Sequence, residues 1–195
     1  MATLNATNLK HASSSSNNIV LGSDGSTTIS NLSGGGKILQ VVQSVKKDAT
    51  SAVSVARDTN WTGHGLSVSI TPSSASSKIY ITGQIMVSNV NSGNSCVNLV
   101  LYKAGSILTA SLGDAGSGQR RVTAGTSSAL DHAITPLVFE YLDTAGGTSS
   151  ITYQPALNTH HSTGQQMYLN RTYGDTADES YVRATSVITA MEIAA

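Results

Sequence analysis

The sequence predicts an all-β protein: an antiparallel β-sandwich of the jelly-roll type, preceded by a short extended N-terminal arm. One stretch shows the period of a half-buried strand, since Leu66, Val68 and Ile70 alternate with Ser and Thr. About eight to ten such segments recur between turn-rich stretches, and none has a convincing helical period. About a quarter of the residues are Ser or Thr, a composition that favours strands and turns over helices.

The expected strands of the main domain follow one another between turns. In chain order they are residues 38–45, 66–70, 79–87, 94–102, 134–142, 151–153, 167–169 and 186–193. Pro72 removes an amide donor after the second of them, and the serine-rich tip at 73–77 supplies a turn. In the third strand we expect Ile81 in the core and Thr82 on the opposite face. Gly83 falls on the apolar face, which indicates a bulge or a close backbone approach.

The N-terminal segment of the chain differs in character from the rest. Residues 1–33 are rich in Asn and Ser around one apolar stretch, Ile19, Val20 and Leu21, and turn chemistry at 22–26 permits a small hairpin. A segment of this size cannot bury enough apolar surface alone, so we expect it to dock on another surface. Three glycines at 34–36 form a predicted hinge. We therefore expect an anchoring arm at 1–33, the hinge, and a β-sandwich at 37–195.

The charge content limits the partners that this chain can have. Only 11% of the residues are charged and the formal net charge is zero, so the basic footprint required by nucleic acids is absent. No apolar run approaches the length of a membrane span, and the first residues lack the features of an export signal. A chain with so few charges is poorly protected against association. We therefore expect a homotrimer, with no nucleic-acid partner and no membrane insertion.

The residues that could support catalysis are not arranged in recognisable motifs. His160 and His161 are adjacent, so on a strand they would point to opposite faces and would not easily bind one metal ion with Asp175 and Asp178. Asp131 and His132 lie in a serine-rich chain, yet no Gly-x-Ser-x-Gly motif accompanies them. We therefore predict that the chain is not an enzyme and uses no metal or other cofactor.

A binding surface is better supported in the last third of the chain. Tyrosine, Asn, Arg and Asp side chains gather there, and such residues on loops recognise sugar hydroxyls through stacking and hydrogen bonds. The candidate contacts are Tyr153, Tyr168, Asn170, Arg171, Tyr173 and Asp175. The alternative is that the tyrosines pack the β core or a threefold interface.

Three stretches resemble segments of known proteins. They are residues 8–21 (NLKHASSSSNNIVL), residues 65–81, and the C-terminal runs 168–176 (YLNRTYGDT) and 186–193 (SVITAMEI). Together they resemble tail-fibre and other virion structural proteins of bacteriophages, especially cyanophages. The resemblance implies a trimeric jelly-roll head behind a thin N-terminal anchor, located on the virion and without catalytic residues.

Three functional hypotheses follow from these observations. The first is a virion fibre or appendage subunit that is attached to other virion proteins through residues 1–33, with Ile19, Val20 and Leu21 as anchoring side chains. Its exposed loops would contact a glycan on the host surface. The second is a capsid decoration protein whose arm grips the shell. The third, from another class, is a monomeric carbohydrate-binding module.

Overall fold

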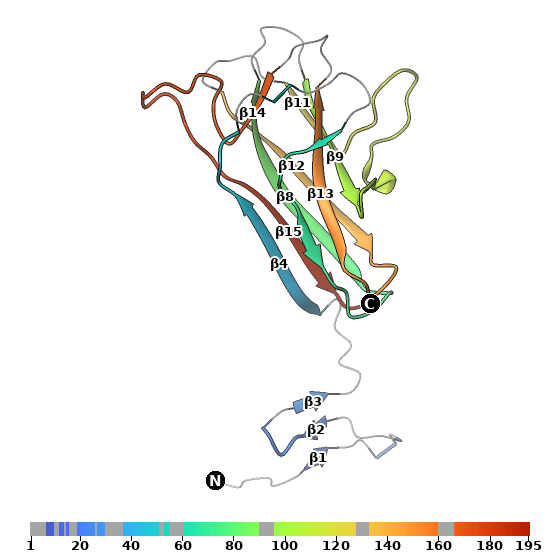
Figure 1. Cartoon of the computed structure of the whole chain (residues 1–195). Coiled ribbons are helices and arrows are strands. Elements are labelled where there is room, and N and C mark those ends of the chain that lie inside the picture. Colours follow the sequence, from blue (N-terminus) through green and yellow to red (C-terminus); the bar gives the residue numbers. More distant parts are fainter. Residues whose placement is uncertain are drawn as a thin grey trace. The chain divides into compact units, whose positions relative to one another are not determined.

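The chain forms two compact units, Met1–Lys37 and Ile38–Ala195, both drawn in Figure 1. The computed structural model describes residues 7–9, 12–13, 15, 19–25, 27–29, 37–50, 53–54, 61–89, 96–127, 133–159 and 166–195. The predicted hinge at 34–36 lies outside these residues.

The first unit is a small antiparallel sheet. Its strands are β1 (Asn8–Leu9), β2 (Ile19–Leu21) and β3 (Thr27–Ile29), in the order β1-β2-β3. The turn between β2 and β3 contains Gly25, whose positive φ of 81° suits a residue without a side chain. Leu9, Val20 and Leu21 are exposed, and Ile19 is half-buried. The sheet therefore leaves Leu9, Val20 and Leu21 in contact with solvent.

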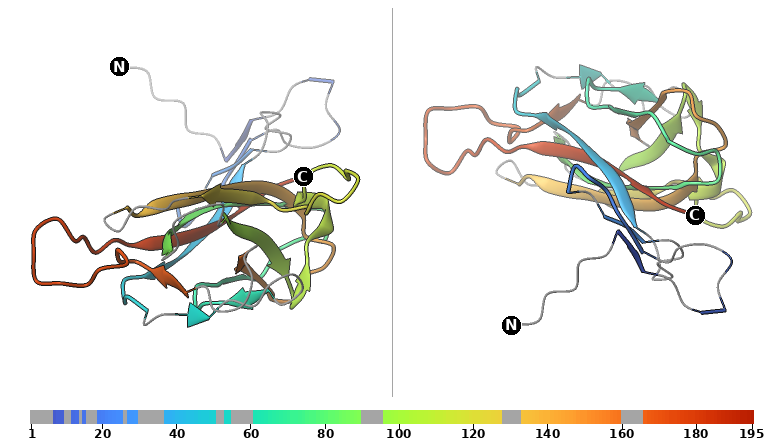
Figure 2. Two further views of the ribbon diagram at one scale, coloured as in Figure 1. Left: turned by 90° about the horizontal axis from the view of Figure 1, so that it is seen from above. Right: turned by 90° about the horizontal axis from the view of Figure 1, so that it is seen from below.

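The second unit consists of two antiparallel sheets (Figures 1 and 2). The first sheet contains β4 (Ile38–Lys46), β5 (Val53–Ser54), β8 (Lys78–Asn89), β12 (Thr135–Thr144), β14 (Gln166–Leu169) and β15 (Ser186–Ile193). The second contains β6 (Thr62–Gly63), β7 (Val68–Ile70), β9 (Cys96–Lys103), β10 (Ser106–Ile107), β11 (Ala124–Ser127) and β13 (Ile151–Thr159). A short 3-10 helix, Thr109–Ser111, lies between β10 and β11.

Several consecutive strands lie end to end in pairs, so that each pair occupies the place of one interrupted strand. β12 pairs with one edge of β8, while β14 and β15 pair with successive parts of its other edge. In the same way, β4 and β5 lie end to end along β15 and β14. β6 and β7 lie along β13, and β10 and β11 lie along β9. Each sheet therefore has four strand positions, with the order β4/5-β14/15-β8-β12 in the first and β6/7-β13-β9-β10/11 in the second.

This strand order is that of a jelly roll. Numbered along the chain, the eight positions run 1-8-3-6 in the first sheet and 2-7-4-5 in the second, so the first strand pairs with the last and the fourth with the fifth. A long antiparallel ribbon that wraps around a core gives this pattern. The prediction of an all-β antiparallel sandwich of the jelly-roll type is confirmed.

The core lies between the two sheets and receives the side chains that alternation predicted. Leu66, Val68 and Ile70 are buried from the second sheet, and Ile79, Ile81, Ile85 and Val87 are buried from the first. These two stretches, adjacent in the sequence, belong to different sheets. β7 pairs with β13, whereas β8 pairs with β12 and β15. The segment at 71–77 therefore crosses from one sheet to the other.

A buried carboxylate joins this crossing segment to the first sheet. Glu192 on β15 is inaccessible to solvent. Its carboxylate accepts hydrogen bonds from the backbone N–H and hydroxyl of Ser73, at 2.8 and 2.6 Å, and from Gln40 Nε2 at 2.6 Å. The bonds from Ser73 and then Gln40 lower the pKa of Glu192 from 4.5 to about 2. The ionised carboxylate is thus the form that the fold stabilises.

Acidification should therefore destabilise the sandwich through Glu192. Because its folded pKa lies below its unfolded pKa, its contribution to stability is complete above pH 4.5 and is lost as the pH falls through about 2. Thermal melts of the wild type and Glu192→Gln between pH 7 and pH 2 will measure this. We expect the variant to melt lower at pH 7 and to lose less on acidification. Parallel pH profiles for the two proteins would contradict this role for Glu192.

Candidate functional site

The candidate site lies where the chain leaves the first sheet between β14 and β15. Residues 170–185 separate β14 from β15 and project from the sandwich as a long loop, drawn in red in Figure 1. The loop begins as a short antiparallel stem, with a bridge between Arg171 and Arg183 and a bond from Thr172 N–H to Val182 O at 3.3 Å. At its tip Asp178 accepts a hydrogen bond from the Ser180 backbone N–H at 2.8 Å. Internal bonds thus hold this segment in place.

Asn170 fixes the base of the projecting loop. It is fully buried and has a positive φ of 58°, a conformation that Asn adopts more readily than most residues. Its side-chain amide donates to the carbonyl oxygens of Lys46 and Asp48, at 2.9 and 3.1 Å. Its side-chain oxygen accepts a bond from Ser186 Oγ at 2.6 Å. Asn170 therefore ties the end of β4 to both ends of the loop, which is a structural role.

Arg171 lies over the ring of Tyr168 and donates to the neighbouring backbone. Its guanidinium carbon is 4.1 Å from the centre of the Tyr168 ring, a distance that suits a cation–π contact. Its Nε donates to Thr50 O at 2.9 Å and its Nη1 to Tyr173 O at 3.4 Å. The Tyr168 and Tyr173 rings are 5.7 Å apart between centroids and inclined at 50°. Arg171 is thus committed to its own chain and orders the aromatic pair.

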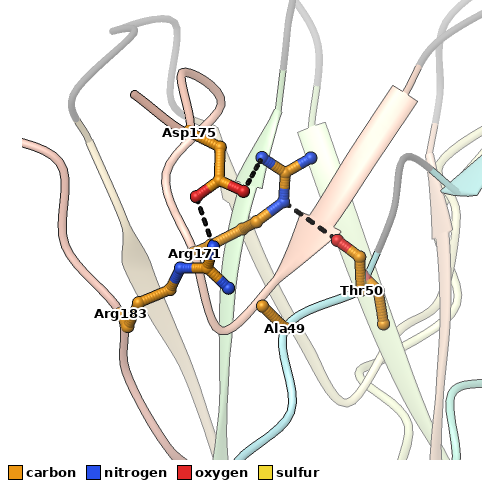
Figure 3. A pocket seen from close by; sticks show the side chains of 5 residues that line it. All are labelled: Ala49, Thr50, Arg171, Asp175 and Arg183. Carbon is orange, nitrogen blue, oxygen red and sulfur yellow. Dashed lines mark hydrogen bonds and ion pairs between the residues drawn. The ribbon is translucent and has the colours of Figure 1, made fainter. Parts of the chain in front are cut away.

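Asp175 connects two arginines across a shallow cavity. Its carboxylate is 2.6 Å from Arg183 Nη2 and 3.4 Å from Arg171 Nη1. Figure 3 shows this carboxylate between the two guanidinium groups. The cavity has a volume of about 120 Å³ and is lined by Ala49, Thr50, Arg171, Asp175 and Arg183. It lies where β4/β5 and β14/β15 are both interrupted, because residues 49–50 follow β4 and residues 171–183 follow β14.

No protein-family model and no curated protein matches this chain.

Four of the six predicted sugar contacts, Tyr168, Arg171, Tyr173 and Asp175, form this cluster. Asn170 lies at its base but is buried. Tyr153 does not belong to the cluster: it is fully buried on β13, and its hydroxyl donates to Asp143 Oδ2 at 2.7 Å. Burial and this bond raise the pKa of Tyr153. Tyr153 fills the core, which is the alternative that the sequence left open for the tyrosines. Tyr168 lies in the cluster but is buried too, so Tyr153, Asn170 and Tyr168 are not part of the exposed surface.

Three side chains of the cluster reach the surface: the aromatic ring of Tyr173, the hydrogen-bond acceptor Asp175 and the donor Arg183. Tyr173 is 37% exposed, and the side chains of Asp175 and Arg183 are 42% and 61% exposed. A ring face beside paired donors and acceptors is suited to hydrogen-bonding the hydroxyls of a sugar. Arg183 was missed by the sequence reading, because its pairing with Asp175 depends on the fold of the projecting loop.

The remaining candidate motifs lie elsewhere in the chain. His160, His161, Asp131 and His132 are outside the described residues. Within the part of the chain that the structure describes, no three His, Cys, Asp or Glu side chains are grouped so as to hold a metal ion. The same part contains no helix with the length and apolar character needed to cross a bilayer.

Proposed function

We propose that this chain is a bacteriophage virion subunit: a homotrimeric fibre or appendage protein. Residues 1–33 attach it to other virion proteins, and the β-sandwich is displayed toward the host. The observation that most supports this proposal is the small size of the first unit. Strands of two or three residues that expose Leu9, Val20 and Leu21 do not form a stable unit by themselves. Such a segment needs another surface to cover its apolar side chains. For an anchoring arm, the site of attachment on the virion supplies that surface.

The architecture of the second unit also supports this proposal. Jelly rolls build many viral shell and lectin domains, although a fold by itself does not specify a function, so this support is by analogy. The motifs at 8–21, 65–81, 168–176 and 186–193 resemble those of phage fibre proteins. With 11 acidic and 11 basic side chains in 195 residues, the chain has the low charge that is tolerable in a subunit held by neighbours.

The anchoring role can be tested by deleting residues 1–33. We expect the remaining chain to keep its β-type circular dichroism and melting temperature, because the core is built from residues 66–190. We expect it to be lost from phage particles, as judged by immunoblotting of purified virions. Ser23→Ala, in an exposed turn of the arm, serves as the control that should be incorporated normally. Incorporation of the truncated chain would refute the anchoring role; loss of folding would place Ile19, Val20 and Leu21 in the main core.

A second candidate function, a carbohydrate-binding module, is favoured by one observation. The surface cluster at Tyr173, Asp175 and Arg183 combines a ring with hydrogen-bond donors and acceptors. In a virion subunit it would be the host-contacting surface. A chain that binds sugars as a monomer and is absent from virions would instead favour the independent module.

A further inference from the structure

The outer face of the first sheet carries two apolar rows. In the register of the sheet, Val45 lies beside Val187, and Gln84 separates Val187 from Val138. Four residues along each strand, Val41, Met191, Tyr80 and Leu142 form a second row across all four strands. Val41, Val45, Val138 and Leu142 are 56%, 46%, 62% and 51% exposed. We call these two rows the outer apolar face.

The outer side of the second sheet is different. Its outward-facing residues Asn98, Val100, Ala156 and Asn158 are buried. Arg120, in the segment between β10 and β11, donates to the side-chain oxygen of Asn158, so the chain's own loop lies over that sheet. Part of the outer side of the second sheet is therefore covered by the chain itself, while the first sheet presents its apolar rows to solvent.

The outer apolar face is large for an exposed surface. Four strands about 4.8 Å apart and eight residues long at about 3.4 Å per residue give a footprint on the order of 500 Å². This footprint includes the polar residues between the two apolar rows, but exposed apolar side chains gathered on one face in this way usually mark an interaction site. A stable interface uses about 800 Å² on each partner, so this face supplies most of one.

The chemistry of the face suits a copy of itself. Between the two apolar rows runs a polar row, Gln43, Thr189, Thr82 and Glu140. Gln43 donates to Thr189 Oγ1 at 3.0 Å within this row, and Glu140 accepts a bond at 2.7 Å from the hydroxyl of Tyr80 in the adjacent row. The face thus needs no partner of opposite charge, and a chain of formal net charge zero does not repel its copies.

We propose that the outer apolar face is the surface through which copies of this chain associate. The proposal rests on the homotrimer of the proposed function and adds the surface that forms it. In a threefold ring each copy meets one neighbour with one side of the face and the other neighbour with the other side. Both the β4 side, at Val41, and the β12 side, at Val138, are then required.

The test is the molar mass of the full-length chain by light scattering across a concentration series. We expect the wild type near three times 20.1 kDa. Val41→Lys and Val138→Lys should each shift the mass toward that of the monomer, or raise the concentration needed for association at least tenfold. Thr152→Lys, at an exposed position on the other sheet, is the matched control and should behave as the wild type. Melting curves verify folding; if a lysine variant does not fold, Val41→Thr and Val138→Thr replace it and should weaken association.

The outcomes separate this inference from the proposed function. Folded Val41 and Val138 variants that remain trimeric would overturn the role of the face and leave the trimer standing. A wild type that stays monomeric at every concentration would overturn the trimer and this interface together. A wild-type dimer that the variants dissociate would support the face and refute threefold assembly.

Discussion

Replacing Gly83 with alanine is expected to destabilise the sandwich severely. A Cβ at this position would lie 2.3 Å from the carbonyl oxygen of Val187 and 2.8 Å from Cζ of Phe139. The first of these atoms belongs to the backbone of β15, so rotation of a side chain cannot relieve the contact. Overpacking a core costs about 1–3 kcal/mol and occasionally more; we expect at least the upper part of that range, measured by urea unfolding.

Gly147→Ala is the matched control for Gly83→Ala. Nothing lies within 4 Å of the Cβ that alanine would add at Gly147, so this substitution should change stability by less than about 0.5 kcal/mol. If the Phe139 ring forms part of the obstacle, Phe139→Leu should recover some of the loss in the double variant. Equal stability of Gly83→Ala and the wild type would show that β8 and β15 are not as closely spaced as we describe.

Gly83 also illustrates which features of the fold could be predicted from the sequence. Its position on the apolar face predicted a bulge or a close approach, and the neighbouring strand does approach closely there. The alternation at 66–70 and 79–87 predicted which residues are buried, because period 2 reports that one face of a strand is covered. It did not predict that β7 and β8 belong to different sheets, since alternation carries no information about which strand lies alongside.

Alternation also does not show which face of a strand points into the core. In β15 the residues Val187, Met191 and Ile193 share one face and are half-buried, whereas Ile188 and Ala190 on the other face are fully buried. Both faces of this strand are apolar. Hydrophobicity therefore cannot tell the core from the outer apolar face, and only the packing of the second sheet distinguishes them.

The candidate site could be predicted where it is local in sequence. Tyr168, Arg171, Tyr173 and Asp175 lie within eight residues, and the stem of the projecting loop keeps them together. Tyr153 was included wrongly because its burial depends on the packing of the two sheets and its hydroxyl on Asp143. Composition showed a gathering of polar aromatic residues but could not show which of them reach the surface.

Replacing Ile81 with alanine is expected to cost about 2–5 kcal/mol of stability, because the lost carbons leave a cavity. Ile81 is fully buried in the middle of β8, where its neighbours are Ala190 on β15 and Tyr141 on β12. Strands paired on both edges restrict the collapse of the site, so the cavity should persist. The free energy of unfolding, from denaturant titration and thermal melts, measures the loss.

Thr82→Ser is the control for Ile81→Ala, since the adjacent residue points to the opposite face of β8. Thr82 is half-buried in the polar row of the outer face, and the loss of one methyl group there should cost well under 2 kcal/mol. A one-residue slip of register would exchange the two results. A sensitive Thr82 with a tolerant Ile81 would therefore mean that the strand is inverted.

Sensitivity at both positions would mean that both faces of β8 are covered, as they are when a second copy occupies the outer apolar face. In that case the effect of Thr82→Ser should grow with protein concentration while that of Ile81→Ala stays constant, because only the former depends on association.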